Sequence, residues 1–192
     1  MIIGEQIKRK IDSFPAGVVF TISDFDFDPS NDPALAKALS RMAASGKLCK
    51  VSKGKYYKPQ ETILGKIKPS TSEIVKDFLE KDGEIIGYIT GPQVFATLGL
   101  TSQISSAIMI GSNKYRRPLQ RGEYKISFLK QDNLISKDNI EFLRILDAIK
   151  LIREIPAASP DTACKAIISL IQSLPPQSTG ELERLSLSYT GY

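Results

Sequence analysis

Basic side chains without acidic neighbours are the strongest chemical signal in the sequence. Residues 33–60 contain no Asp or Glu but carry Lys37, Arg41, Lys47, Lys50, Lys53, Lys55 and Lys58. Such a run can neutralise phosphates and release the counterions of a nucleic acid, which makes binding depend on salt. It can also be a solvated face with no partner. The elements that carry the charges decide between these interpretations.

A second basic cluster lies farther along the chain. It consists of Lys114, Arg116, Arg117, Arg121 and Lys125, with Glu123 as its one acid. Two β-prone segments, 106–110 and 124–129, flank it, so we expect an exposed β-hairpin arm. Its partner could be DNA, an RNA or an acidic protein face, and a solvated face is an equally good interpretation.

Three alternating carboxylates, Asp24, Asp26 and Asp28, have the Asp-x-Asp spacing with which nucleotidyltransferases hold metal ions. Those enzymes carry a Gly-Ser pair shortly before the aspartates, and here the nearest pair, Gly111–Ser112, follows far behind them. Asp24 and Asp28 are better interpreted as residues that begin helices, where a carboxylate accepts backbone N–H groups.

The composition removes most other catalytic chemistry. The chain has no histidine, which excludes Ser-His-Asp and Cys-His catalysis and histidine-liganded zinc or iron. Its two cysteines, Cys49 and Cys164, cannot form a thiolate metal site alone, and we expect them to be reduced thiols. We therefore predict that the protein is not an enzyme and has no metal or cofactor.

Length and hydropathy set the scale of the fold. The chain has 192 residues, of which 42% are hydrophobic and 24% charged, and its net charge is +5. This is enough for one large domain or two small ones. No apolar run is long enough to span a membrane, and no signal-peptide core occurs at the N-terminus, so we expect a cytoplasmic protein.

Helical periodicity and turn residues predict the elements of the first part. Residues 3–14 have apolar positions at helical spacing. Residues 18–21 are β-prone, and Ser23 is expected to cap a short helical segment that holds Phe25 and Phe27. A longer helix is predicted from Pro33, with Asp32 as its N-cap, to about Ser45. Gly46 is expected to end it.

That longer helix has two different faces. Leu35, Ala38, Leu39 and Met42 recur at helical spacing and should face a core, whereas Lys37, Ser40, Arg41 and Ala44 lie on the other side. Two β-prone segments, 48–51 and 55–58, follow around a Ser-Lys-Gly turn and predict a hairpin.

This order of elements is typical of a winged helix-turn-helix, which we predict for residues 1–62. The helix face with Lys37, Ser40 and Arg41 would enter the major groove of DNA. The hairpin, or wing, would carry Lys50, Lys53, Lys55 and Lys58 along the phosphates. Winged helices also dock proteins or RNA, and this interpretation stays open.

Residues 63–192 are predicted to form a mixed α/β domain with a helical C-terminal part, so the fold class is α+β. A capping box at Ser70–Glu73 predicts a helix that ends at Gly83. Strands are expected at 84–89, 106–110 and 124–129, and a short helix at 93–98. Helices are expected from 137 to before Pro156, from a cap at Asp161 to before Pro175, and at 180–187. Gly83, Gly87 and Gly91 are interpreted as turn residues.

Two pairs of segments resemble a known family. The stretches VVFTISDF (18–25) and ALAKALSRMAASGKLCKVSKGKYYKP (34–59) resemble the winged-helix domain of AbiEi-type antitoxins and their DUF6088 relatives. The stretches GYITGPQVFATLGLTSQ (87–103) and SSAIMIGSNKYRRPLQRGEYKISFL (105–129) resemble the domain that follows it, and the Gly-Leu-Thr-Ser-Gln signature at 99–103 adds specificity.

The resemblance implies a function. Such proteins are antitoxins of bacterial abortive-infection and toxin–antitoxin operons that repress their own operon, while the C-terminal part counters a nucleotidyltransferase toxin. The family's helix core corresponds to 38–42 here and its wing to 53–57. The expected partners are double-stranded operator DNA and a cognate nucleotidyltransferase toxin. Because one short recognition helix offers few base contacts, we also expect two chains to bind side by side on paired half-sites of one DNA. The C-terminal region is shorter than in the larger antitoxins.

Overall fold

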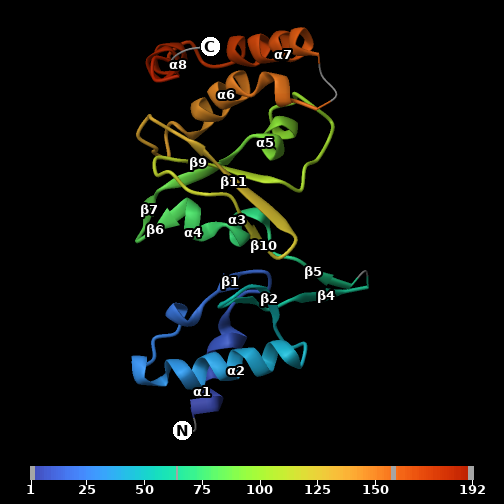
Figure 1. Ribbon diagram of the computed structural model, residues 1–192, viewed down its shortest axis with the longest axis vertical. Coiled ribbons are helices and arrows are strands. Elements are labelled where there is room, and N and C mark those ends of the chain that lie inside the picture. The colour runs from blue at the N-terminus through green and yellow to red at the C-terminus, as the bar shows by residue number, and fades with distance from the viewer. Residues whose placement is uncertain (1–2, 64, 157–158, 190–192) are drawn as a thin grey trace. The chain divides into compact units, whose positions relative to one another are not determined.

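A computed structural model describes residues 3–63, 65–156 and 159–189, and it confirms a mixed α+β protein (Figure 1). The chain divides into two compact units, Met1–Val75 and Lys76–Tyr192. Each unit has its own hydrophobic core. Among the described residues, no helix combines the length and the apolar character that crossing a membrane would need.

The first unit begins with the predicted order of helix, strand, short helix, longer helix and hairpin. Its strands β1, β3 and β2 form an antiparallel sheet in that order, and β4 and β5 form a separate hairpin. The elements are α1 (Ile3–Ser13), β1 (Val19–Phe20), the 3-10 turns η1 (Ile22–Asp24) and η2 (Pro29–Asn31), α2 (Asp32–Ala44), β2 (Cys49–Ser52), β3 (Lys55–Tyr57), β4 (Gln60–Thr62), β5 (Gly65–Ile67) and α3 (Thr71–Ile74).

The core of the first unit joins the apolar faces of α1 and α2 to the sheet. Ile7 and Ile11 of α1 and Leu35 and Leu39 of α2 are buried, as the helical spacing predicts. Phe20 of β1 packs among them, with its ring centroid 4.6 Å from that of Phe14 in a stacked arrangement. Aromatic packing therefore fixes the short strand β1 against the helices.

Two local predictions in this unit need correction. The turn η1 begins after Thr21 rather than Ser23, and Phe25 and Phe27 lie outside it. Asp32 is the first residue of α2, and Asn31 occupies the N-cap position. Both errors arise where several short polar residues adjoin, because any of them can cap a helix.

The boundary between the units falls after Val75, not after residue 62 as predicted. Ser70 accepts a hydrogen bond from the Glu73 backbone N–H, which is half of the predicted capping box. The Glu73 carboxylate, however, accepts the backbone N–H of Val19 in β1 over 3.0 Å. Lys66 of β5 likewise donates to the carbonyl of Gly46 after α2. These bonds attach residues 63–75 to the first unit.

The second unit is built on a four-stranded sheet in the order β10-β11-β9-β8. Figure 1 shows α4 on one face of this sheet and α5 and α6 on the other, with α7 and α8 beyond α6. The elements are α4 (Lys76–Leu79), β6 (Glu80–Lys81), β7 (Glu84–Ile85), β8 (Gly87–Thr90), α5 (Pro92–Thr97), β9 (Ile108–Ser112), β10 (Leu119–Arg121), β11 (Tyr124–Lys130), α6 (Ile140–Lys150), the 3-10 turn η3 (Ile152–Glu154), α7 (Pro160–Gln172) and α8 (Ser178–Ser186).

Several predicted elements of this unit exist, with shifted limits. Helices α5, α6, α7 and α8 lie within a few residues of their predicted ranges, and Ser159 rather than Asp161 caps α7. The helix expected to end at Gly83 is instead two short helices, α3 and α4, followed by the hairpin β6–β7. Gly87 lies inside strand β8, where a Cβ would stand 2.4 Å from the carbonyl oxygen of Phe78, so close packing explains it and a turn does not.

The prediction that segments 106–110 and 124–129 form a β-hairpin is also wrong. Strand β9 runs parallel to β11, with Ile108 opposite Ile126. The extra strand β10 pairs with β11 in antiparallel fashion on the other side. The basic stretch therefore crosses from β9 to the sheet edge before the chain returns through β11.

Candidate nucleic-acid interface and apolar groove

Helix α2 presents the basic face that the sequence predicts. Leu35 and Leu39 are fully buried, whereas Lys37, Ser40 and Arg41 are exposed on the opposite side. The helix ends at Ala44 with Ser45 as its C-cap, and Gly46 follows in the left-handed conformation (φ 77°) that glycine adopts without strain. Since no acid lies between residues 33 and 60, the exposed face is electropositive.

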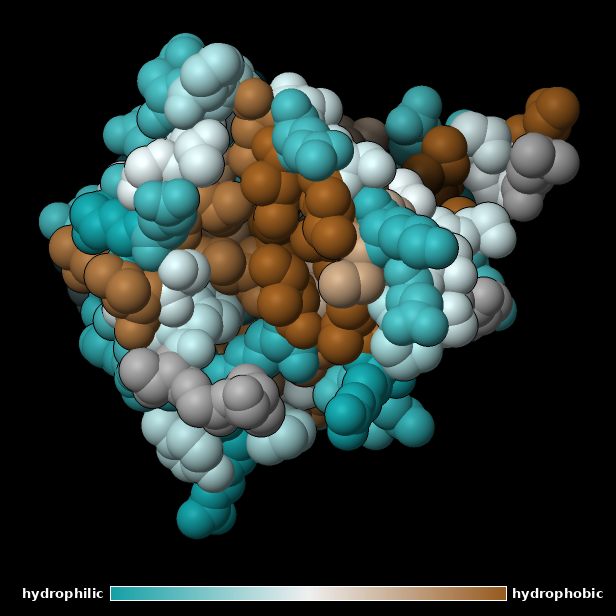
Figure 2. Space-filling view, turned by 90° about the horizontal axis from the view of Figure 1, so that it is seen from above, coloured by the Kyte–Doolittle hydropathy of each residue, from teal (hydrophilic) through white to brown (hydrophobic). Residues whose placement is uncertain are grey.

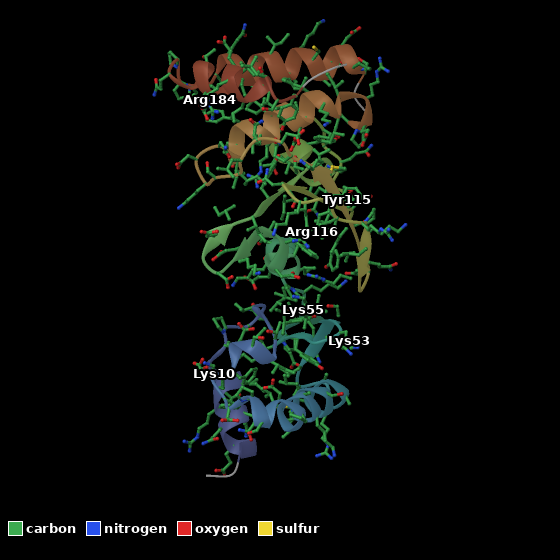
Figure 3. The ribbon with its side chains drawn as sticks, turned by 60° about the vertical axis from the view of Figure 1, so that its left-hand side comes forward. Lys10, Lys53, Lys55, Tyr115, Arg116 and Arg184 are labelled. Carbon is green, nitrogen blue, oxygen red and sulfur yellow. The ribbon has the colours of Figure 1, made fainter. Side chains whose placement is uncertain are left out.

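The hairpin β2–β3 carries further lysines. Gly54 (φ 74°) makes its turn, and the pairs Cys49–Tyr57 and Lys50–Tyr56 set its register. Lys50 and Lys53 are exposed, and Lys55 is half-buried. Figure 3 labels Lys53 and Lys55 on this hairpin.

Lys58 has a different environment from the other predicted wing lysines. Its ammonium group donates a hydrogen bond of 3.0 Å to the carbonyl oxygen of Asp12 in α1. This bond ties the end of the hairpin to the end of the first helix. Lys58 therefore has a structural role, and its ammonium group is directed at the protein itself.

Asp24 and Asp28 bond to residues at the start of 3-10 turns, as predicted: Asp24 is the third residue of η1 and bonds back to its N-cap Thr21, and Asp28 is the N-cap of η2. The Asp24 carboxylate accepts the backbone N–H and the hydroxyl of Thr21, at 2.7 and 3.0 Å. Asp28 accepts the backbone N–H of Ser30, and hydrogen bonds from Ser30 lower the pKa of Asp28. Asp26 lies 3.8 Å from the ammonium group of Lys10. Each carboxylate thus faces a donor or cation of its own unit.

The second basic cluster separates into structural and exposed residues. Arg121 is buried, and its guanidinium forms two hydrogen bonds with the Asp77 carboxylate at 2.7 and 3.0 Å. Arg116 lies with its guanidinium 5.2 Å from the ring centre of Phe78. Lys114, Arg117 and Lys125 are exposed. The prediction of one exposed basic arm is therefore wrong for Arg121 and for the side chain of Arg116.

The comparison with known families covers both units. The sequence model of DUF6088, described as a family of unknown function, matches residues 6–178. The chain belongs to the DUF6088 family. No curated protein matches this DUF6088 chain significantly.

Sequence reasoning missed a buried polar network in the second unit of this DUF6088 protein. The carboxylate of Asp147, which is fully buried in α6, accepts hydroxyl hydrogen bonds from Tyr88 and Thr90 at 2.7 Å and from Tyr189 at 2.6 Å. Gln131 donates to the hydroxyls of both tyrosines. Burial raises the pKa of Asp147, and burial together with the nearby carboxylate raises the pKa of Tyr88 and of Tyr189.

The absence of a side chain at Gly111 makes room for the Tyr88 ring of this network. Tyr88 lies across Gly111 of the neighbouring strand, where a Cβ would stand 2.4 Å from the tyrosine ring. A signal existed in the sequence, because Asp147 interrupts the apolar stripe formed by Leu143 and Leu146 in α6 and by Leu151 directly after it. A carboxylate on a buried helix face needs donors from other elements.

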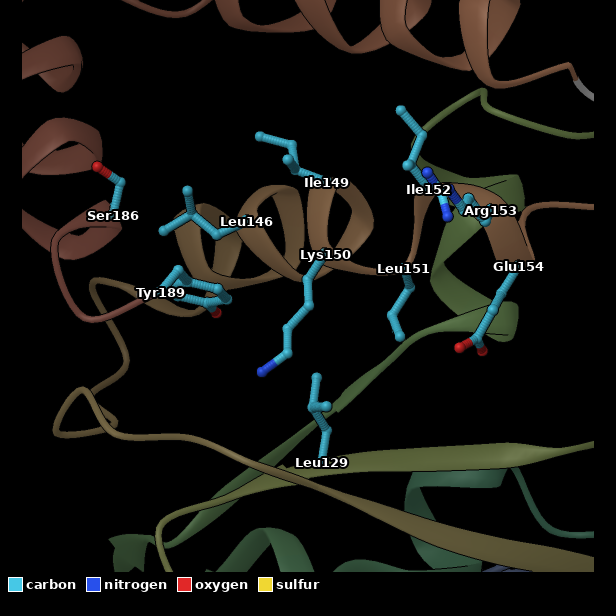
Figure 4. Close-up of a pocket in the computed structure, with 10 residues that line it drawn as sticks. All are labelled: Leu129, Leu146, Ile149, Lys150, Leu151, Ile152, Arg153, Glu154, Ser186 and Tyr189. Atoms are coloured by element: carbon cyan, nitrogen blue, oxygen red, sulfur yellow. The ribbon is translucent and has the colours of Figure 1, made fainter. Parts of the chain in front are cut away.

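An apolar groove of about 1010 Å³ opens beside the network at the helical end of the second unit. Leu129, Leu146, Ile149, Leu151 and Ile152 give it an apolar lining, and Lys150, Arg153, Glu154, Ser186 and Tyr189 complete it (Figure 4). Ile149, Ile168 and Leu187 are exposed on or directly after α6, α7 and α8. Figure 2 shows apolar side chains gathered at this end, with polar residues around them. Exposed apolar surface of this kind is typical of an interaction site.

Proposed function

We propose that this DUF6088 protein is a non-enzymatic DNA-binding antitoxin that represses its own operon. The observation that carries the proposal is the exposed, acid-free face of α2, followed directly by a hairpin with exposed lysines. The sheet order β1-β3-β2 supports assigning the first unit to the winged helix-turn-helix class, because the first strand of such domains pairs with the returning strand of the wing. Because a fold alone does not determine function, the proposal depends on the basic face of α2 and the hairpin and not on this fold analogy.

The roles of the basic residues follow from their positions. On α2, Lys37, Ser40 and Arg41 would reach base edges in the major groove, where arginine forms paired hydrogen bonds with guanine. On the hairpin, Lys50, Lys53 and Lys55 would contact phosphates, which position the protein without reading sequence. Lys58 is excluded from this set because its ammonium group bonds to Asp12.

The antitoxin part of the proposal rests on the resemblance to AbiEi-type proteins and on the apolar groove. An apolar segment of the nucleotidyltransferase toxin would enter the groove between α6 and α8. Lys150 and Arg153 at the groove would favour acidic residues at the flanks of that segment.

A gel-shift assay on the full chain tests the DNA part. The protein should prefer duplex DNA from upstream of its own gene over random duplex. Arg41→Ala should weaken binding to the preferred duplex by about 1–3 kcal/mol, while Lys53→Ala should weaken binding to both duplexes alike. Lys8→Ala, an exposed lysine of α1, is the charge-matched control. Equal binding of both duplexes by the unchanged protein would refute the repressor proposal.

The second candidate is a module that docks protein or RNA without repressing transcription, and the groove favours a protein ligand. If the neighbouring gene encodes a nucleotidyltransferase, growth rescue of cells that express that enzyme separates the candidates. Ile149→Asp should abolish rescue because it places a charge in the groove. Ile104→Asp, at an isoleucine that is 93% exposed outside the groove, should leave rescue intact. Rescue by both variants would refute the groove as the toxin site.

A further inference from the structure

The loop of residues 113–118, between β9 and β10, carries exposed aromatic and basic side chains that contribute little to the stability of the second unit. It contains Lys114, Tyr115, Arg116 and Arg117 and no acidic residue. Tyr115, labelled in Figure 3, is 81% exposed. Lys114 and Arg117 on either side are exposed as well. A large aromatic ring in water between two cations adds little to the stability of the unit.

Two residues of the loop, Asn113 and Arg116, anchor it to the rest of the second unit. The Asn113 side chain donates to the carbonyl oxygens of Gln131 and Asn133 at 2.7 and 2.6 Å and accepts the backbone N–H of Ile135. The Arg116 guanidinium lies against the rings of Phe78 and Phe128, 5.2 and 6.0 Å from their centres. These anchors keep the loop backbone in place although it forms no regular strand.

The next strand strengthens this support. Arg121 lies on the Phe78 ring, 4.8 Å from its centre, and its guanidinium is fixed by the paired hydrogen bonds to Asp77. Phe78 therefore contacts two guanidinium groups, one from each end of the segment 116–121. Exposed residues lie between the anchored ones, so Lys114, Tyr115 and Arg117 are presented on a support that is ordered before any ligand arrives.

We propose that this loop binds single-stranded nucleic acid, with one unpaired base stacked on the Tyr115 ring. Lys114 and Arg117 would neutralise the phosphates on the two sides of that base. An aromatic ring between cations is the arrangement with which proteins bind single strands, because every base has a flat face that stacks on it. A paired base in a duplex has both faces covered by its neighbours, so it cannot stack on the ring.

This site uses none of the residues of the proposed duplex interface. It lies in the second unit, whereas the face of α2 and the hairpin β2–β3 lie in the first. An acidic protein surface is the competing ligand, because it would also be attracted by Lys114 and Arg117. It would not need the flat ring, and this difference decides the test.

Fluorescence of the full-length Tyr115→Trp variant gives a direct measurement. The natural chain has no tryptophan, so the new indole reports on this position alone. Its emission should be quenched by a twelve-residue oligothymidine or oligouridine. The oligonucleotide that quenches at the lower concentration indicates whether DNA or RNA is preferred. Heparin, a polyanion without bases, should bind without this quenching. Equal quenching by heparin, or none by either oligonucleotide, would overturn the proposal.

Affinities from fluorescence anisotropy with labelled oligothymidine provide the second measurement. Tyr115→Ala should weaken binding about tenfold, and Tyr115→Phe should retain it, because stacking needs the ring and not the hydroxyl. Tyr115→Ala should leave duplex binding unchanged, while Arg41→Ala should leave oligothymidine binding unchanged. Since Tyr115 is exposed, circular dichroism melts of the variants should match that of the natural protein. Unchanged oligothymidine affinity in folded Tyr115→Ala would refute the stacking site.

Discussion

The salt dependence of DNA binding tests how many charges of the first unit contact phosphates. Of the seven basic residues between 33 and 60, Lys58 bonds within the protein and Lys37 and Arg41 are assigned to base edges, which leaves Lys47, Lys50, Lys53 and Lys55. If each of these four neutralises one phosphate, log K should fall with log salt with a slope of about −3.6. Affinity should then drop about 150-fold between 50 and 200 mM salt.

Single substitutions divide this total into its parts. Lys53→Gln should reduce the magnitude of the slope by about 0.9, because one fewer counterion is released. Lys8→Gln removes the same charge from the exposed face of α1 and should leave the slope unchanged. Lys58→Gln should also leave the slope unchanged but lower the free energy of unfolding, since it removes the bond to Asp12.

Fluorescence anisotropy of a labelled duplex at four salt concentrations is sufficient for this measurement. The reasoning fails if Lys53→Gln and Lys8→Gln give equal slopes, because the hairpin would then not touch phosphates. It also fails if Lys58→Gln changes the slope by as much as Lys53→Gln, because the ammonium group of Lys58 would then leave Asp12 for the DNA.

Two further predictions concern the second unit. Because burial raises the pKa of Asp147, this group stabilises the fold fully below its unfolded pKa and less as pH rises through the raised folded pKa. In urea unfolding, the free energy of unfolding of the natural protein should therefore fall relative to that of Asp147→Asn as pH increases. A rise of the natural protein's free energy of unfolding relative to that of the variant would contradict this. Gly111→Ala should lower the free energy of unfolding by about 1–3 kcal/mol because the new Cβ meets the Tyr88 ring, whereas Gly180→Ala in α8, with nothing within 4 Å, should be neutral or stabilising, and equal melting temperatures for both variants would disprove the steric argument.

Local periodicity predicted the helices and the hairpin of the first unit because their apolar positions repeat at the spacing of the element. The two faces of α2 could be assigned for the same reason, from Leu35 and Leu39 against Lys37 and Arg41. The path of the basic stretch after β9 could not be predicted, because the sequence does not reveal that β10 is inserted at the sheet edge.

Long-range polar pairs were the other source of error. Arg121 looks like any surface arginine until Asp77, 44 positions earlier, is placed beside it. The network around Asp147 joins residues from β8, α6 and the segment after α8, and no local pattern links them. The proposed role of Tyr115 could not be predicted, because exposure of an aromatic ring cannot be read from spacing alone.

The hydrogen bond from Val19 to Glu73 has a consequence for association between molecules. Strand β1 is an outer strand of its sheet, and an open strand edge offers backbone N–H groups to which a strand of another chain can pair. Glu73 occupies the Val19 N–H and places a negative charge beside it. A fragment that ended at residue 62 would keep the basic helix and hairpin but lose this protection, so it should be prone to edge-to-edge aggregation. A fragment that ended at residue 75 would retain it.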